Sequence, residues 1–157
     1  MTHIIHPTAG GVAITTPTGE VPIEQVAAQV APDGIYAIVT ADAIPSDTTF
    51  RAAWVYADGS IEVDLDKAKA IGHDLRRKQR SAAFAPLDDL IAKQIPGVDF
   101  TEVEAKRQAI RDKDKEVQQL IDAAETPEQI KAALGFEPQP EPAPEQVEEP
   151  ILLTEEV

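Results

Sequence analysis

The side chains best suited to metal binding or proton transfer in this 157-residue chain are three histidines, and there is no cysteine. His3 and His6 have a spacing at which two histidines of a helix can share a metal ion. The sequence around them is typical of a strand, Pro7 follows, and no third ligand lies at a suitable spacing. His73, beside Gly72, is expected to be a partly exposed helix residue. The sequence therefore predicts no metal site and no cofactor.

Carboxylates are abundant, and Asp64 with Asp66 is the pair closest to a general acid and base. Both stand at the expected start of a helix, where a carboxylate satisfies free amide donors, so capping already explains them. The pair Gly10-Gly11 is not followed by a phosphate-binding pattern, and no G-x-S-x-G motif occurs. The sequence predicts no catalytic residues and a protein that is not an enzyme. A small hydrolase using scattered carboxylates is the remaining enzymatic alternative.

The densest positive charge is a basic cluster, Arg76, Arg77, Lys78 and Arg80. Such a cluster can contact phosphates, but no aromatic residue lies between its members to stack on bases. A helix face that pairs with acidic residues of a neighbouring segment or subunit is therefore the favoured interpretation. The candidate interaction face combines this cluster with apolar residues at helical spacing: Leu75, Leu87, Ile91 and Ile95.

The formal charge of −14 is distributed unevenly along the chain. Residues 1–66 carry −8, residues 67–115 carry +4 and residues 116–157 carry −10. A basic centre between acidic ends repels nucleic acid and anionic membranes overall, yet it can meet an acidic protein surface. No apolar run reaches the length of a membrane helix, and the first residues lack a signal-peptide pattern. We expect protein partners, and no nucleic acid, membrane or small-molecule substrate.

The first part of the chain has the pattern of short strands and turns. Short strands are predicted at 3–6 and 12–14, a short helix at 22–31, and a β-branched strand at 35–40. A hairpin is predicted at 50–63, with its first strand running from Phe50 to Tyr56. In that strand, the alternation would place on one face Phe50, Ala52, Trp54 and Tyr56.

The second part has the 3.6-residue period of helices. Asp64 is expected to cap a first helix, which Pro86 kinks or ends and which closes at Pro96-Gly97. Thr101 to Glu104 reads as a capping box for the next helix. That helix is predicted to break at 111–116, where no residue is apolar.

A last short helix is predicted from Thr126, with Pro127 at its first position and Gln129 completing a capping box, and Gly135 ends it. The sequence after it is acidic and rich in proline, a composition that buries too little apolar area to fold. This tail is interpreted as a solubilising segment; a docking role would use Ile151, Leu152 and Leu153.

These elements predict an α+β fold: a β-rich N-terminal module at 1–63, a helical hairpin module at 64–135, and a disordered or extended acidic Pro-rich tail at 136–157. Only seven aromatic residues are present, so the core must be small and largely aliphatic. Association with a second copy or with a partner is therefore expected.

Four segments resemble small proteins encoded among the tail and tail-fibre genes of tailed bacteriophages. They are TFRAAW at 49–54, DLDKAKAIGHDLR at 64–76, RQAIRD at 107–112 and IDAAETPEQIKAAL at 121–134. The resemblance covers roughly residues 45–135. It departs from the group at Gln108-Ala109-Ile110, where Q-x-L is usual, and in the Glu/Pro-rich tail.

The resemblance implies a setting more than a reaction. It implies a structural component of the phage tail, baseplate or fibre that acts by contacts with other tail proteins or with itself. The alternative is a tail-fibre assembly chaperone that is not retained in the virion. The implied location is the tail of the virion, after synthesis in the host cytoplasm.

Overall fold

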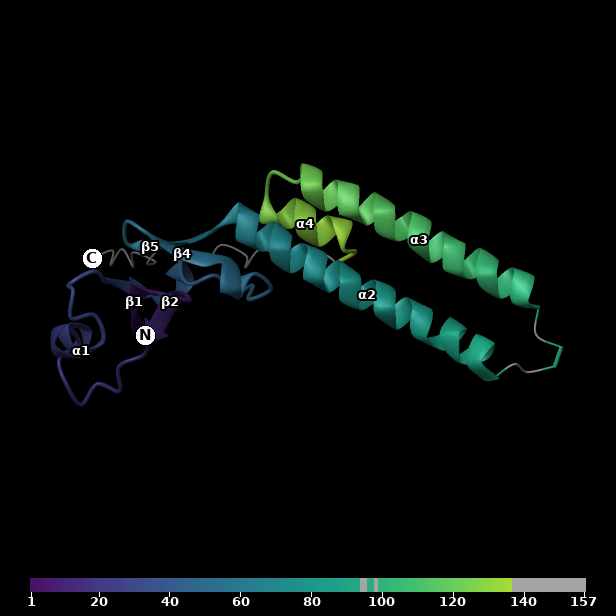
Figure 1. Cartoon of the computed structure of the whole chain (residues 1–157). Helices are drawn as coiled ribbons and strands as arrows, with labels where there is room; N and C mark the ends of the chain where they lie inside the picture. The colour runs from purple at the N-terminus through teal and green to yellow at the C-terminus, as the bar shows by residue number, and fades with distance from the viewer. Residues whose placement is uncertain (94–95, 98, 137–157) are drawn as a thin grey trace, which may run out of the picture.

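The computed structural model describes residues 1–93, 96–97 and 99–136. It confirms the α+β class: two small antiparallel sheets lie at one end, and the helices follow in the chain. Two long helices extend away from the sheets side by side, and a short helix packs against them near the sheets (Figure 1).

The first sheet has the strand order β2-β1-β3 and is antiparallel throughout. Its strands are β1 (Thr2–Thr8), β2 (Gly11–Thr15) and β3 (Ala37–Thr40). Ile4 and Ile5 of the central strand are fully buried. Consecutive residues of a strand point to opposite faces, so both faces of β1 are covered. All three predicted strands are confirmed, with shifted ends.

Two helical segments flank β3. The predicted short helix is α1 (Ile23–Val30), which buries Ala27 completely. Pro22 precedes its first residue, where a proline ring fits because no intrahelical amide donor is needed. A single 3-10 turn, η1 (Ala41–Ala43), follows β3.

The second sheet is a hairpin of β4 (Trp54–Ala57) and β5 (Ser60–Val63), preceded by the 3-10 turn η2 (Arg51–Ala53). The prediction of a strand beginning at Phe50 is wrong for its first four residues. The Ala53 amide donates to the Phe50 carbonyl at 2.8 Å, which closes a turn. Strand alternation would separate these two residues, but the turn buries both of them. Burial of both side chains therefore overrides the β-pattern.

The long helix α2 runs unbroken over Leu65–Lys93. Asp64 caps it as predicted, since its Oδ1 accepts from the Lys67 amide at 3.1 Å. The helix continues through Pro86, so of the two predicted alternatives, a kink or an end, the end does not occur. Pro86 and Ala82, whose carbonyl loses its helical donor, are both exposed, and water can supply the missing hydrogen bond.

The second long helix, α3, spans Phe100–Ala123. Its N-cap is Asp99, which accepts from the amides of Thr101 and Glu102, so the capping box predicted at Thr101 is placed too late. The break predicted at 111–116 is also wrong, because α3 is continuous there. A charged side chain in this stretch is held by α2, as described below.

The short helix α4 (Pro127–Ala133) confirms the predicted start, with Thr126 Oγ1 accepting from the Gln129 amide at 3.3 Å. The Gln129 side chain in turn accepts from the Glu125 amide at 2.7 Å. Gly135 follows with φ +77°, the left-handed conformation that ends many helices.

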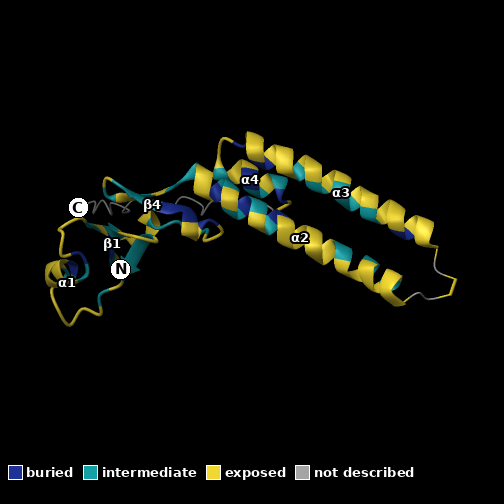
Figure 2. Ribbon diagram, in the orientation of Figure 1, coloured by how far each residue is buried: buried dark blue, intermediate teal, exposed yellow. Residues whose placement is uncertain are grey.

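The largest buried cluster joins the hairpin end to the base of the helices (Figure 2). Its members come from the turn before β4 and from α2, α3 and α4 with their C-caps: Phe50, Ala53, Ala68, Ile121, Ala124, Ile130 and Leu134. The cluster therefore contains residues from both sides of the boundary drawn at residue 63, and the division into modules 1–63 and 64–135 stays a prediction. The tail at 137–157 lies outside the described residues.

Candidate interaction site between the two long helices

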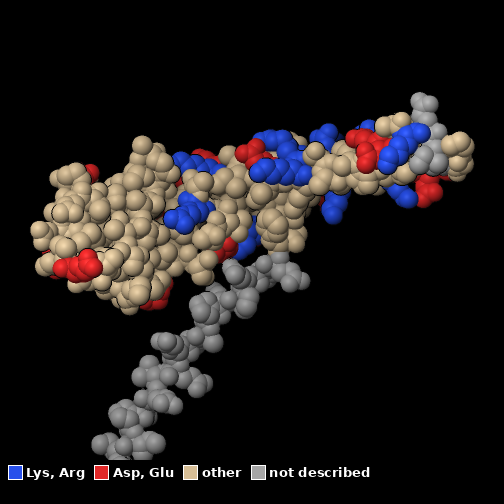
Figure 3. Space-filling view, turned by 90° about the horizontal axis from the view of Figure 1, so that it is seen from below, with Lys and Arg blue, Asp and Glu red and all other residues tan. Residues whose placement is uncertain are grey.

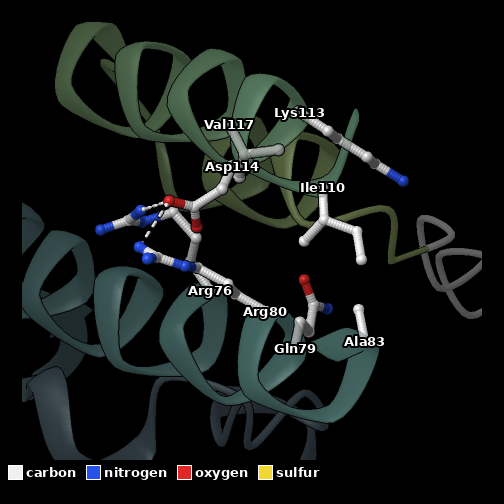
Figure 4. A pocket seen from close by; sticks show the side chains of 8 residues that line it. All are labelled: Arg76, Gln79, Arg80, Ala83, Ile110, Lys113, Asp114 and Val117. Carbon is white, nitrogen blue, oxygen red and sulfur yellow. Dashed lines mark hydrogen bonds and ion pairs between the residues drawn. The ribbon is translucent and has the colours of Figure 1, made fainter. Parts of the chain in front are cut away.

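Asp114 is the centre of the contact between α3 and α2 (Figure 4). Its Oδ2 accepts from Arg76 Nη1 at 2.6 Å and from Arg80 Nη1 at 3.3 Å. The Asp114 and Arg76 side chains are each 10% exposed, whereas that of Arg80 is 48% exposed. One buried carboxylate thus holds two arginines that lie one helical turn apart.

This buried pair leaves two polar atoms without a hydrogen bond in the described part of the chain, Asp114 Oδ1 and Arg76 Nε. Removing opposite charges from water is costly, and the short contact between Asp114 and Arg76 offsets that cost. Burial of such a pair is weak evidence for net stability, and we expect its main effect to be on the register of α3 against α2.

A pocket lies beside the pair, in the groove between α2 and α3, with a volume of about 230 Å³. Figure 4 shows arginines from α2 and a lysine from α3 near its edge, with aliphatic side chains from both helices. Gln79 ties the pocket to α4, since its Nε2 donates to the Leu134 carbonyl at 3.1 Å. The residues that line it are Arg76, Gln79, Arg80, Ala83, Ile110, Lys113, Asp114 and Val117.

A second hollow, of about 620 Å³, surrounds the ring of Phe84 farther along α2. The guanidinium carbons of Arg80, Arg107 and Arg111 lie 5.7, 5.1 and 5.9 Å from the ring centroid, within cation–π range. Arg107 also pairs with Asp88 of α2. This Phe84 cluster is a second contact between α2 and α3, farther from the sheets than the Asp114 pair.

Glu104 on α3 contributes to the same cluster. Its carboxylate accepts from Arg111 Nη1 at 2.7 Å and lies 3.3 Å from Arg107 Nε. The hydrogen bond from Arg111, with the nearby charges, lowers the pKa of the Glu104 carboxyl below its ordinary value. The arginines around Phe84 are therefore paired with acids and do not form a field of unbalanced positive charge.

The basic cluster predicted as one solvated face is divided by the helix. Arg76 is buried and points to α3, so it is not available on the surface. Arg77 pairs with Asp74 on its own helix, and Lys78 is exposed. The predicted pairing with acids of a neighbouring segment holds for Arg76 and Arg80, both of which meet Asp114. Figure 3 shows both signs of charge interspersed along the helices, and little charge over the sheets on that face.

The apolar members of the candidate interaction face have different surroundings. Leu75 packs against the buried cluster, and Leu87 is partly buried. Ile91 is 40% exposed near the end of α2. Ile95 lies outside the described residues, and so do all three members of the candidate docking tail, Ile151, Leu152 and Leu153.

The N-terminal histidines are held by ordinary local contacts. His3 Nδ1 lies 2.8 Å from Thr16 Oγ1, and His6 Nδ1 lies 3.3 Å from the Pro7 carbonyl. Within residues 1–93, 96–97 and 99–136, no group of three or more histidine, aspartate or glutamate side chains is placed to hold a metal ion.

His73 joins the two long helices at their base, where its Nε2 lies 3.0 Å from Asp122 Oδ1. Lys69, one turn before it, donates from Nζ to the Asp122 carbonyl at 2.9 Å. A histidine–aspartate pair can serve acid–base chemistry, but here both groups are tied into a helix-to-helix contact. Asp64 caps α2, as predicted, and Asp66 is exposed in its first turn.

The sequence signal for Asp114 was overlooked. It stands at spacings of four, three and four with Ile110, Val117 and Ile121, so it occupies a position in the apolar stripe of α3. An acid in such a position predicts a cationic partner on the facing helix. The sequence does not predict the surroundings of Phe84, because two of the three arginines near its ring, Arg107 and Arg111, lie on α3.

No protein-family model, curated protein or solved structure matches the chain. None of the described helices combines the length and the apolar composition needed to cross a membrane.

Proposed function

We propose that this chain is a non-enzymatic bacteriophage tail-associated protein, a component of the tail, baseplate or fibre that works by protein–protein contacts. The resemblance of residues 45–135 to small phage tail proteins supports the proposal. The shape of the helical hairpin, in which two long helices project beyond the buried cluster, also supports it.

We define the arm as residues 81–93 of α2 and 100–113 of α3. The observation that carries the proposal is that Val103 is the only buried residue of this arm. Ile91 and Phe100 are 40% and 45% exposed near its end. Large exposed apolar side chains on a projecting element are typical of a surface that meets a partner.

The experiment compares particles of the encoding phage with and without the gene. We expect mass spectrometry to find the chain in purified wild-type virions, and electron microscopy to show defective tails when the gene is deleted. A chain absent from virions, with defective fibres after deletion, would establish the assembly chaperone instead. A chain absent from virions, with normal tails after deletion, would reject both roles.

Two variants test whether the far end of the arm makes the contact. Ile91→Glu places a charge on its exposed apolar end, and Ala85→Glu places the same charge on another exposed position of α2. We expect the first variant to be lost from virions and the second to be retained, with the same helical content by circular dichroism. Equal incorporation of both would show that the arm end is not the contact.

A further inference from the structure

The pocket beside Asp114 continues a groove whose first part is already filled. At the base of the long helices, α4 lies between α2 and α3 and buries Ile130 and Leu134 there. The pocket follows where α4 ends, since Gln79 both lines it and donates to the Leu134 carbonyl. The chain therefore leaves α4 at the edge of an unfilled apolar slot.

The slot has an apolar wall and a positively charged rim. Ala83, Ile110 and Val117 supply aliphatic surface. Arg76 and Arg80 share the single charge of Asp114, and Lys113 adds another cation, so the lining carries three positive charges against one negative charge. The occupant that fits is a short aliphatic segment with acidic residues on both sides.

Residues 137–157 contain a segment with this pattern. They carry seven glutamates and no basic residue, and Ile151-Leu152-Leu153 is their one run of three large aliphatic residues. Glu148-Glu149 precedes this run and Glu155-Glu156 follows it. Acidic flanks on an aliphatic centre complement a basic rim on an aliphatic wall.

The connecting chain is long enough. Fourteen residues lie between Phe136 and Ile151, and a proline-rich segment spans about 3.1 Å per residue, so the reach is about 43 Å. The chain leaves α4 next to the pocket, where Gln79 contacts the Leu134 carbonyl, so docking of the tethered segment is an intramolecular event. Weak contacts then suffice for docking within one chain.

We propose that Ile151-Leu152-Leu153 docks in the pocket between α2 and α3 of its own chain. Docking covers the aliphatic wall next to the Asp114 pair and extends the packing that α4 begins. A partner that binds the groove must displace this segment, so the tail acts as an intramolecular competitor.

A spin label on the tail tests the proposal in the full chain. The protein has no cysteine, so Thr154→Cys provides one labelling position. We expect the oxidised nitroxide to remove most of the backbone amide signal of Ala83, Ile110 and Val117 in the isotope-labelled protein, relative to the reduced label. Amides of the first sheet should keep their intensity.

Two changes should abolish the signal loss without unfolding the protein. The first replaces all three residues of the aliphatic run by serine. The second, Ala83→Glu, puts an acid on the exposed wall of the pocket, and Ala85→Glu is its matched control on the same helix. We expect the loss to disappear in Ala83→Glu and to persist in Ala85→Glu, with unchanged melting temperatures.

Mixing separates the possible occupants. Isotope-labelled chain without a nitroxide is combined with spin-labelled chain at natural abundance. If the pocket amides lose signal in this mixture, the tail docks on a second copy, and the proposal is overturned. Absence of any loss at the pocket, or loss centred on another surface, would also overturn it, and none of these results depends on the phage-tail assignment.

Discussion

Gly72 of α2 lies against Ile130 of α4 so closely that a Cβ on residue 72 would be 2.6 Å from Ile130 Cγ2. Glycine in a helix interior is unfavourable, by about 1 kcal/mol relative to alanine. This glycine therefore permits an approach of the two helices that any other residue would prevent.

We predict that Gly72→Ala destabilises the fold although alanine is the better helix former. Overpacking against a fully buried side chain costs about 1–3 kcal/mol, which exceeds the propensity gain of about 1 kcal/mol over most of that range. Urea unfolding of both proteins measures the difference. In an Ile130→Ala background the added methyl group has space, so the two changes together should cost less than their sum. A stabilised single variant would contradict the close packing.

The Arg76–Asp114 pair predicts a large effect from a small change. Asp114→Asn keeps the shape of the side chain but leaves the buried Arg76 guanidinium without a counter-charge, which should cost about 3–5 kcal/mol in unfolding free energy. Asp74→Asn removes the exposed pair with Arg77 and should cost less than about 1 kcal/mol. Chemical denaturation compares the two, and equal losses would show that the Asp114 pair is effectively solvated.

Replacing both Arg76 and Asp114 by apolar residues tests whether the pair adds net stability. Arg76→Met with Asp114→Leu removes both buried charges, and we expect a stability within about 1 kcal/mol of the parent or above it. The double variant should also lose the fixed register of α3 on α2, which cross-helix contacts in a nuclear Overhauser spectrum would reveal.

Asp47 predicts a loss of stability in acid. A hydrogen bond from Lys131 of α4, together with those from Thr49, lowers the pKa of the Asp47 carboxyl from 3.8 to about 2. A carboxyl whose pKa is lower in the folded state stabilises the fold above the unfolded pKa, and this contribution is lost as the pH falls from about 4 to about 2. The Asp47 side chain is 31% exposed, so we expect at most about 2 kcal/mol.

Asp47→Asn should therefore flatten the acid limb of a stability-against-pH curve between pH 4 and pH 2. Lys131→Gln should flatten the same limb, and the double variant should lose no more than either single one. A full acid limb in Asp47→Asn would mean that other carboxyls control this range.

Phe84 predicts a local effect on the arm. Phe84→Leu keeps an apolar side chain but removes the ring that three arginines approach, at a cost of about 1 kcal/mol. Hydrogen exchange should then be faster in residues 81–93 and 100–113 and unchanged at the base of the helices. Uniformly faster exchange would show that the arm and the base unfold together.

The sequence predicted the start of a helix correctly where a single capping residue determines it. The caps Asp64 and Thr126 are correct because a side-chain oxygen at a helix start has one dominant use. The strand predicted from Phe50 failed because the cluster that buries Phe50 and Ala53 is completed by Ala68 and by four residues more than sixty positions later. Such long-range burial leaves no local pattern.

The helix break predicted at 111–116 failed for a related reason. Six polar residues give no local sign of a partner, yet Asp114 in their midst is held by Arg76 and Arg80 from a helix more than thirty residues earlier. The four charges of the basic cluster point in different directions around the helix, so Arg76 is buried while Lys78 is exposed, and the candidate interaction face as a whole stays a prediction. The packing of α4 on α2 depends on the contact between Gly72 and Ile130, and a local sequence pattern does not show this contact because the two residues are far apart in the chain.

Among the residues that the structure describes, the arm joins the rest of the chain at its base, next to the buried cluster and the Lys131–Asp47 pair. The 29 residues of α2 are about 43 Å long, so a rotation of about 10° at the base moves the far end by about 7 Å. A slight change in how the sheet-bearing end is seated thus becomes a displacement larger than a helical turn at the tip. A small rotation about the buried cluster is therefore amplified along the two long helices into a large movement of the tip.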